Sequence, residues 1–334
     1  MGDHRPSALL LMNAATYDEA FRDDARTELE TLLDLRVPLP VTHLDLPDDV
    51  VERVEILVTS WGVPRLDDEA LARMPKLRAI FHAAGTIRPF LSPGALESGV
   101  TVCAAADANA GPVAEFTFAQ IILALKRVGR LADRYRTQRR PRDLSGMPVL
   151  GTHGVTVGVV GASRVGRKVV ERLHTIDARV LLADPYVEAS EARELGAEPV
   201  PLDELCARSD VVTLHAPLTP STIGLVGERQ LALMRDGAVL VNTARGGIVD
   251  HAALTPHVVS GRLDAWLDVT DPEPLPDDSP LWDLPNVALT PHLAGALGNE
   301  VSRLGDQAMA ELRRYLDGRP LRHQIQAADL ARIA

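Results

Sequence analysis

The fold class follows from the segment Val157-Gly158-Val159-Val160-Gly161-Ala162-Ser163-Arg164-Val165-Gly166. A β-branched run typical of a buried strand leads into a glycine-containing turn, and a helical pattern begins inside that turn. This order matches the dinucleotide-binding fingerprint of Rossmann folds, in which a pyrophosphate binds at the helix N-terminus. Gly161 is expected to make the tight turn, and Gly166 to let the helix pack close against the strand.

The middle position of the fingerprint departs from the usual pattern. Ser163 stands where a glycine normally lets the backbone approach the pyrophosphate. Its hydroxyl could donate a hydrogen bond to a phosphate oxygen, or it could crowd the ligand and weaken binding. The sequence leaves both outcomes open.

Asp184 lies 18 residues beyond Gly166, at the end of the next predicted strand. Fingerprint proteins carry at this place the acidic residue that hydrogen-bonds the ribose hydroxyls. A carboxylate there would repel the extra phosphate of NADP, so the sequence predicts NAD as the cofactor. The competing interpretation is that Asp184-Pro185 only starts a turn.

Short apolar runs alternate with helical-period segments on both sides of the fingerprint, which is the pattern of parallel βαβ structure. In the first third the predicted strands are 9–12, 56–59, 77–81 and 100–103, with helices such as 17–33 and 67–74. A long helix is predicted over 110–135, followed by a Pro- and Gly-rich boundary or arm over 139–148. Later strands are predicted over 155–160, 179–183, 210–214, 238–242, 264–267 and 287–290, with a final helix over 298–316. The chain is therefore predicted to be α/β, with a doubly wound middle domain and a second α/β domain in its N-terminal third.

Composition excludes several classes of protein. The net charge of −11, from 35 basic and 46 acidic residues, argues against a nucleic-acid partner. No apolar run is expected to span a membrane, and the polar N-terminus lacks the apolar core of a signal peptide, so a cytoplasmic location is predicted. Cys103 and Cys206 have no metal-type spacing and form no disulfide framework, so no metal is predicted and both are interpreted as core residues.

Polar residues follow three later strands at the edge where ligands of open α/β sheets bind. Arg245, Glu273 and His292 each come just past a predicted strand end. Arg245 could hold a substrate carboxylate and polarise the neighbouring keto oxygen. His292 could exchange a proton with that oxygen, and Glu273 could fix the imidazole tautomer and favour its charged form.

Each of these residues alone has an ordinary structural interpretation. A single Arg in a loop is usually a surface charge, a Glu between prolines a solvated turn, and a His structural. Their joint position behind three strand ends of one domain favours a function in hydride transfer to a carbonyl, with the hydride carried by the cofactor.

The ordered motifs resemble those of the D-isomer-specific 2-hydroxyacid dehydrogenases. The resemblance spans essentially the whole chain and is most specific between about residues 105 and 296. Besides the fingerprint, its motifs are Asn109-Ala110, Val113-Ala114-Glu115, Asp184-Pro185-Tyr186, Leu214-His215-Ala216-Pro217-Leu218-Thr219, Arg245-Gly246-Gly247, Asp268-Val269, Glu273-Pro274 and Pro291-His292.

The resemblance implies a fold, a catalytic set and a cofactor site. It implies a Rossmann-type NAD-binding domain over 107–298 and a smaller flavodoxin-like substrate domain over 1–106, to which the C-terminal helix, 299–334, returns. Arg245, Glu273 and His292 would be catalytic, and Asp268 would meet the nicotinamide amide. The remaining cofactor contacts would be Gly161, Ser163, Arg164, Val165, Gly166, Asp184, Ala216, Thr243, Ala244, Ala294 and Gly295. A homodimer formed through the cofactor domains is also implied.

The first domain departs from the family pattern. The substrate loop reads Ala83-Ala84-Gly85-Thr86-Ile87-Arg88 instead of Gly-x-Gly with an acidic-amide pair, although the N–H groups of Ala84, Gly85 and Thr86 could still hold a carboxylate. Arg88 either favours a substrate with a second anionic group or is a surface residue paired with an acid. Trp61 either narrows an apolar pocket or is buried between helices.

The leading prediction is an NAD-dependent enzyme that interconverts a 2-oxo acid and a D-2-hydroxy acid. Formate dehydrogenases share the scaffold but carry Gln where this chain has Glu273, which disfavours that activity. A short phosphoglycerate, phosphite or hydroxypyruvate enzyme stays open. The alternatives are a non-enzymatic NAD-sensing scaffold on the same fold and a dehydrogenase disabled by Ser163 or by the altered loop.

Overall fold

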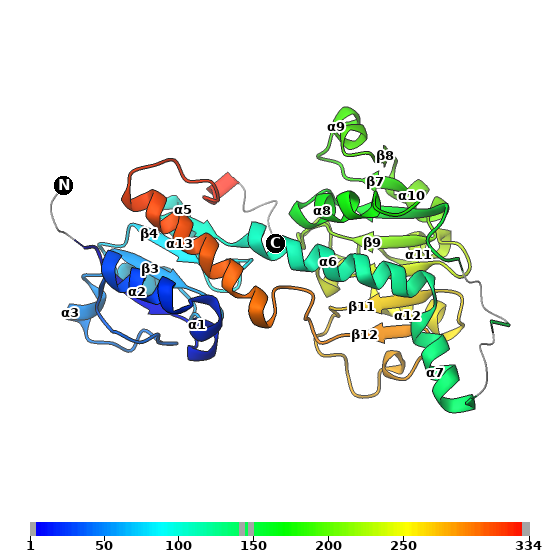
Figure 1. Ribbon diagram of the computed structural model, residues 1–334, viewed down its shortest axis with the longest axis horizontal. Helices are drawn as coiled ribbons and strands as arrows, with labels where there is room; N and C mark the ends of the chain where they lie inside the picture. Colours follow the sequence, from blue (N-terminus) through cyan, green and yellow to red (C-terminus); the bar gives the residue numbers. More distant parts are fainter. Residues whose placement is uncertain (1–4, 140–143, 146–149, 329–334) are drawn as a thin grey trace. The chain divides into compact units, whose positions relative to one another are not determined.

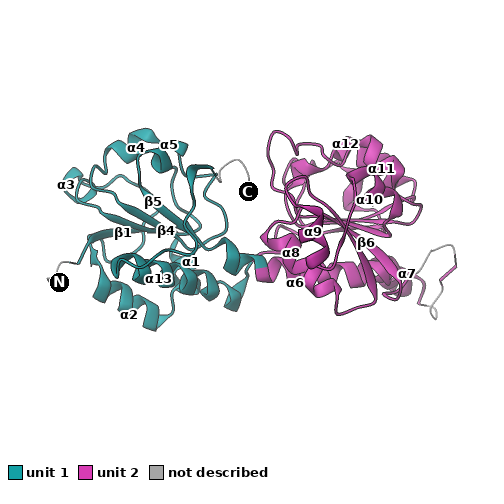
Figure 2. Ribbon diagram, turned by 90° about the horizontal axis from the view of Figure 1, so that it is seen from above, with its two compact units in different colours: residues 1–110, 296–334 teal, residues 111–295 magenta. Residues whose placement is uncertain are grey.

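The structure is a computed structural model that describes residues 5–139, 144–145 and 150–328. It divides into two compact units, shown in Figure 2: unit 1 is Met1–Ala110 with Ala296–Ala334, and unit 2 is Gly111–Gly295. Each unit is built on one parallel sheet with helices, which confirms the predicted α/β fold class. Most of the predicted arm over 139–148 lies outside the described residues.

Unit 1 contains a five-stranded sheet in the order β2-β1-β3-β4-β5, the flavodoxin-like order. Every neighbouring pair is parallel, so all strands present their carboxyl ends at one edge. The strands are β1 Ser7–Leu11, β2 Asp34–Leu35, β3 Ile56–Thr59, β4 Ala79–His82 and β5 Thr101–Ala104. The helices are α1 Ala14–Ala20, α2 Asp23–Leu32, α3 Asp48–Val51, α4 Asp68–Ala72, α5 Pro93–Glu97 and α13 Ser302–Leu316.

The buried strands of this sheet separate two apolar layers. One layer joins α1, α2 and α13 to alternate strand residues such as Leu10, whereas the other packs on residues such as Leu9 and lies under α3, α4 and α5 (Figure 2). The C-terminal helix α13 enters the first layer through Leu304 and Leu312, and the backbone of Ala20 comes so close to Gly305 that no Cβ would fit.

Unit 2 contains a seven-stranded parallel sheet in the order β12-β11-β10-β9-β6-β7-β8. The strand order reverses between β9 and β6, which makes their carboxyl ends the expected ligand crevice of a doubly wound sheet. The strands are β6 Val155–Val160, β7 Ala178–Ala183, β8 Glu198–Pro199, β9 Val211–Leu214, β10 Val239–Asn242, β11 Asp264–Leu267 and β12 Val287–Leu289. The helices are α6 Ala106–Leu125, which enters from unit 1, α7 Val128–Gln138, α8 Arg164–Leu173, α9 Ala189–Glu194, α10 Leu202–Arg208, α11 Glu228–Leu233 and α12 His251–Val259.

The two faces of this sheet are covered by different helices. α10, α11 and α12 pack on one face, and α6, α8 and α9 on the other (Figures 1 and 2). Cys206 is buried in the first of these layers and Cys103 in unit 1, as expected for core residues. Burial raises the pKa of each thiol to about 12, so neither is a reactive thiolate at neutral pH.

Two predicted helices are each divided in the structure. The helix predicted over 110–135 is wrong as a single element, because Arg127 takes a left-handed conformation (φ 55°) between α6 and α7. This turn lets the buried Arg127 side chain reach Asp264 at 2.7 Å. The helix predicted over 17–33 is interrupted where the fully buried Phe21 adopts extended backbone (ψ 99°).

The expectation that no apolar run reaches membrane-spanning length needs correction. α6 has 20 residues and a mean hydropathy of 1.2, so length and composition alone would allow a span. Half of its apolar stretch is buried within the protein, where Ala114, Ile121 and Leu125 join the core of unit 2.

Candidate active site

The glycine turn of unit 2 lies between β6 and α8, as the fingerprint predicts. Gly161 has a φ of +93°, and a Cβ there would come within 2.6 Å of the Ala216 backbone nitrogen. At Gly166 a Cβ would lie 2.0 Å from the Gly161 carbonyl oxygen. Neither position admits a side chain, so the turn has the close backbone packing that a dinucleotide cradle requires.

Ser163 is the N-cap of α8. Its Oγ accepts a hydrogen bond from the Gly166 backbone N–H at 3.3 Å, which satisfies one of the free donors at the helix N-terminus. The hydroxyl proton is not used in this bond and stays available to a phosphate oxygen.

The Asp184 carboxylate is fixed against the glycine turn. Its Oδ2 accepts from the Ala162 N–H at 2.7 Å, and its Oδ1 from the Tyr186 N–H at 2.8 Å. Each carboxylate oxygen can accept a further hydrogen bond, so ribose hydroxyls could bind without displacing these contacts. The side chain therefore has a structural function as well as the position predicted for ribose recognition.

Arg245 lies in a loop that follows β10, and the side chain of Asn242, at the end of β10, stabilises this loop through hydrogen bonds. The buried Asn242 side chain donates from Nδ2 to the Arg245 carbonyl at 2.9 Å and accepts from the Ala244 N–H at 3.0 Å. Burial lowers the pKa of the Arg245 guanidinium, and the nearby Glu273 carboxylate opposes that shift. An Arg stays charged in proteins, so the loop presents a fixed, partly desolvated cation.

His292 and Glu273 form a direct pair, although they come from loops after different strands. His292 Nδ1 lies 2.8 Å from Glu273 Oε1, and both side chains are nearly half exposed within unit 2 (49% and 43%). With Nδ1–H donating to the carboxylate, Nε2 is left for a reacting group. The structure thus brings two of the three predicted catalytic side chains, His292 and Glu273, into direct contact. Arg245 lies close enough to Glu273 for the carboxylate charge to affect its pKa.

The loop that contains His292 is hydrogen-bonded to Asp268. Asp268 Oδ1 accepts from the Thr290 hydroxyl at 2.6 Å and from the Leu293 N–H at 2.9 Å, while Oδ2 accepts from the Ala294 N–H at 2.9 Å. Its backbone carbonyl accepts from the His292 N–H at 2.9 Å, and His292 itself has a φ of +53°. This buried carboxylate positions the imidazole, in addition to the nicotinamide contact predicted for it.

The other predicted cofactor residues lie at the same ends of the strands. Ala216, Thr243 and Ala294 are buried, and the Thr243 hydroxyl lies 2.7 Å from that of Thr117 on α6. Arg164 is the first residue of α8 and is exposed. The remaining members are Val165, Ala244 and Gly295, all partly exposed.

The predicted substrate loop belongs to unit 1, where it follows β4. The N–H groups of Ala84 and Gly85 have no acceptor among the described residues, as a carboxylate cradle requires. The buried His82 supports this loop, since its Nδ1 lies 2.8 Å from the Thr59 hydroxyl and its ring also bonds the Thr86 backbone.

Trp61 follows β3 at the same edge of the unit 1 sheet. Its side chain is 40% exposed, so the interpretation that it is buried between helices is wrong.

Sequence reasoning missed Asn242 and His82 as positioning residues. Asn242 ends the Val239–Asn242 strand directly before the Arg245 loop, and a polar residue at a strand's carboxyl end is the signal that would have found it. His82 carries the same signal, because it ends the Ala79–His82 strand, but the sequence does not indicate that its partner would be Thr59 on a neighbouring strand.

These features define a dinucleotide-binding α/β protein with a histidine–carboxylate pair at the same edge of the sheet as its cofactor turn. The family model of the D-isomer specific 2-hydroxyacid dehydrogenase NAD binding domain matches residues 118–294, so the chain belongs to the D-isomer-specific 2-hydroxyacid dehydrogenases, and unit 2 contains their NAD-binding domain.

Curated relatives agree with this assignment. The chain is 36% identical over 270 residues to a glyoxylate reductase of Korarchaeum cryptofilum, covering 79% of the chain and 81% of that protein. It is 36% identical over 255 residues to a D-3-phosphoglycerate dehydrogenase of Mycobacterium tuberculosis, covering 76% of the chain but 48% of that protein. The chain thus spans about half the length of the phosphoglycerate dehydrogenases it matches.

Solved structures share the fold over nearly the whole chain. A phosphoglycerate oxidoreductase from Rhizobium etli has a TM-score of 0.81 at 25% identity, covering 98% of this chain and 100% of that one. A D-lactate dehydrogenase from Aquifex aeolicus, complexed with NAD and lactic acid, has a TM-score of 0.73 at 26% identity, covering 93% and 96%.

Proposed function

We propose that the chain is an NAD-dependent enzyme that interconverts a 2-oxo acid and a D-2-hydroxy acid. The observation that carries this proposal is the His292–Glu273 contact of 2.8 Å, held in the NAD-binding unit beside Arg245. Bound NAD supplies or accepts the hydride. An acid–base imidazole and a carboxylate-binding guanidinium are the protein groups that such a reaction needs.

Each side chain then has one task. Arg245 binds the substrate carboxylate through its planar fork and polarises the adjacent carbonyl oxygen. His292 gives a proton from Nε2 to that oxygen during reduction and takes it back during oxidation, while Glu273 holds Nδ1–H and stabilises the imidazolium. Asp184 favours NAD over NADP, because its carboxylate would face the extra phosphate. In unit 1 the N–H groups of Ala84, Gly85 and Thr86 are proposed to bind a carboxylate.

The first experiment is turnover of NADH with a panel of 2-oxo acids, from glyoxylate and pyruvate to branched, aromatic and phosphorylated acids. His292→Ala is the test variant. His153→Ala is its matched control, because His153 is an exposed histidine of unit 2 whose Nδ1 also lies 2.9 Å from a carboxylate, that of Asp177. Turnover that disappears only in His292→Ala supports the proposal.

Two results would contradict the proposal, and binding of NADH measured by calorimetry tells them apart. Tight NADH binding without turnover of any acid would favour a non-enzymatic NAD-sensing scaffold. Absence of NADH binding would show a disabled dehydrogenase site.

We further propose a cytoplasmic homodimer that forms through unit 2. Exposed apolar side chains on α6 and α7 support this interface: Leu123, Val128 and Tyr135 are 40%, 38% and 66% exposed. Light scattering of the purified chain tests the proposal, and a monomer at micromolar concentration would contradict it.

A further inference from the structure

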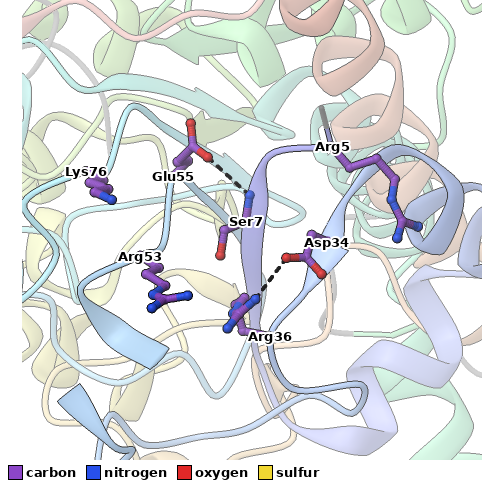
Figure 3. Close-up of a pocket in the computed structure, with 7 residues that line it drawn as sticks. All are labelled: Arg5, Ser7, Asp34, Arg36, Arg53, Glu55 and Lys76. Atoms are coloured by element: carbon purple, nitrogen blue, oxygen red, sulfur yellow. Dashed lines mark hydrogen bonds and ion pairs between the residues drawn. The ribbon is translucent and has the colours of Figure 1, made fainter. Parts of the chain in front are cut away.

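A cavity of about 380 Å³ lies in unit 1 at the edge of the sheet where the strands begin. β1 begins at Ser7 and β2 at Asp34, while Lys76 shortly precedes β4. In a parallel sheet this edge is opposite to the carboxyl ends, which carry the 83–88 loop, so the cavity is separate from the proposed substrate loop. The residues that line it, drawn in Figure 3, are Arg5, Ser7, Asp34, Arg36, Arg53, Glu55 and Lys76.

The lining carries an excess of positive charge in a chain of net charge −11. Four of its seven side chains are cationic and two are carboxylates. The Asp34 carboxylate is already bonded, since its Oδ2 accepts from Arg36 Nη1 at 2.9 Å. Arg53 and Lys76 are exposed, and no carboxylate of the described residues pairs with either. These two exposed cations that line the cavity are therefore available to bind an anionic ligand.

Two buried donors in the same wall lack partners. Ser7 is 9% exposed, and neither its Oγ nor the Nε of Arg36 has a hydrogen-bond partner among the described residues. Figure 3 shows the Ser7 hydroxyl turned toward Arg53 and Arg36. Glu55 does not satisfy it, because Glu55 Oε1 accepts from the Ser7 backbone N–H at 3.4 Å instead. Buried polar groups are normally paired, so two unpaired donors on residues that line a cationic cavity point to an absent acceptor.

We propose that this cavity is a binding site for a small phosphate dianion, either inorganic phosphate or the phosphoryl group of a monoester. A phosphate offers several acceptor oxygens, which suits an Arg fork, a second cation and a hydroxyl at one opening. The bound dianion would connect the first residues of β1, β2, β3 and β4, and would thereby stabilise unit 1. This proposal does not depend on the proposed dehydrogenase activity.

The test is calorimetric titration of the full chain with inorganic phosphate, with NADH present in excess to block the cofactor site. Ionic strength is held constant with sodium chloride, because charge screening alone changes weak anion binding. The test variants are the double variant Arg53→Gln/Lys76→Gln and the single variant Ser7→Ala. Arg193→Gln, which removes an exposed cation of α9 in unit 2, is the matched control.

Wild type and Arg193→Gln are expected to bind phosphate alike, whereas each cavity variant should bind about tenfold more weakly, as expected for loss of a charge-assisted hydrogen bond. Ser7→Ala removes a hydroxyl without a partner, so its melting temperature in the absence of phosphate should not fall. Phosphate should raise the melting temperature of wild type and raise it less in both variants.

Glycerol 3-phosphate binding at least as tightly as inorganic phosphate would identify a monoester as the ligand, and weaker binding would identify inorganic phosphate. No binding by wild type, unchanged affinity in either cavity variant, or an equal loss in Arg193→Gln would overturn the proposal.

Discussion

His292 Nδ1 lies 2.8 Å from Glu273 Oε1, and the two residues are held by loops that follow β12 and β11. Because Glu273 stabilises the imidazolium, Glu273→Gln should lower the rate of 2-oxo acid reduction by about 10²-fold.

Steady-state measurement of kcat in both directions checks this effect. Replacing the exposed Asp277 by Asn controls for removal of a nearby acidic charge, because Asp277 makes none of the contacts described for the site. An unchanged kcat in Glu273→Gln would show that Glu273 is only a surface residue beside the histidine.

Asp268→Asn tests the support of the histidine loop. The carboxylate accepts three hydrogen bonds, and an amide in its place would turn an NH₂ group toward at least one of the donors. We expect a loss of about 1–3 kcal/mol of unfolding free energy and a large fall in kcat. Urea denaturation and steady-state kinetics measure the two effects. Full stability together with lost activity would assign Asp268 to cofactor contact alone.

The sequence predicted the sheets of both units well, because β-branched runs and the glycine fingerprint are local signals. Strands 155–160, 264–267 and 56–59 match the observed bounds. The strands β2 and β8, each of two residues, were missed, since such short elements have no periodicity. The break at Arg127 was missed for another reason, because it depends on a partner far along the chain, Asp264.

The candidate site was predictable to a similar degree. The sequence indicates Arg245, Glu273 and His292 as candidates because each follows a strand that has a clear apolar pattern. The side-chain contacts that position them were not found, since the carboxylate of Asp268 and the amide of Asn242 bond to backbone groups of folded loops. A sequence pattern can indicate where a polar residue lies, but it does not indicate which backbone group it will bond.

Gly166→Ala should abolish NADH binding. Its Cβ would lie 2.0 Å from the Gly161 carbonyl oxygen, so the turn and α8 would have to separate. Gly129→Ala is the matched control, because a Cβ at Gly129 in α7 meets nothing within 4 Å. That control should bind NADH normally and gain up to about 1 kcal/mol in stability. Equal NADH affinity in both variants would mean that the turn does not form the cofactor site.

Ser163→Gly tests the unusual position of the fingerprint. Glycine is an acceptable N-cap and should cost only a few tenths of a kcal/mol in stability, so NADH affinity can be interpreted directly. Because the hydroxyl proton is free of the capping bond, we expect it to bind phosphate and the variant to bind NADH more weakly. Calorimetric titration measures the change. Tighter binding in the variant would show that the side chain crowds the cofactor.

His82 and His215 should stay neutral throughout the physiological pH range. Burial lowers the pKa of each imidazole to about 3, although a bond from His82 to the Thr86 backbone opposes the shift. Between pH 6.5 and 3 the unfolded chain therefore binds more protons than the folded one. As the pH decreases through this range, the free energy of unfolding decreases by up to about 1.4 kcal/mol per pH unit for each histidine. The two ring signals can be assigned in NMR spectra by their loss in His82→Gln and His215→Gln. In the folded protein their chemical shifts should not change between pH 8 and 5. The same signals in urea should titrate, and movement of either in the folded protein would refute its burial as a neutral ring.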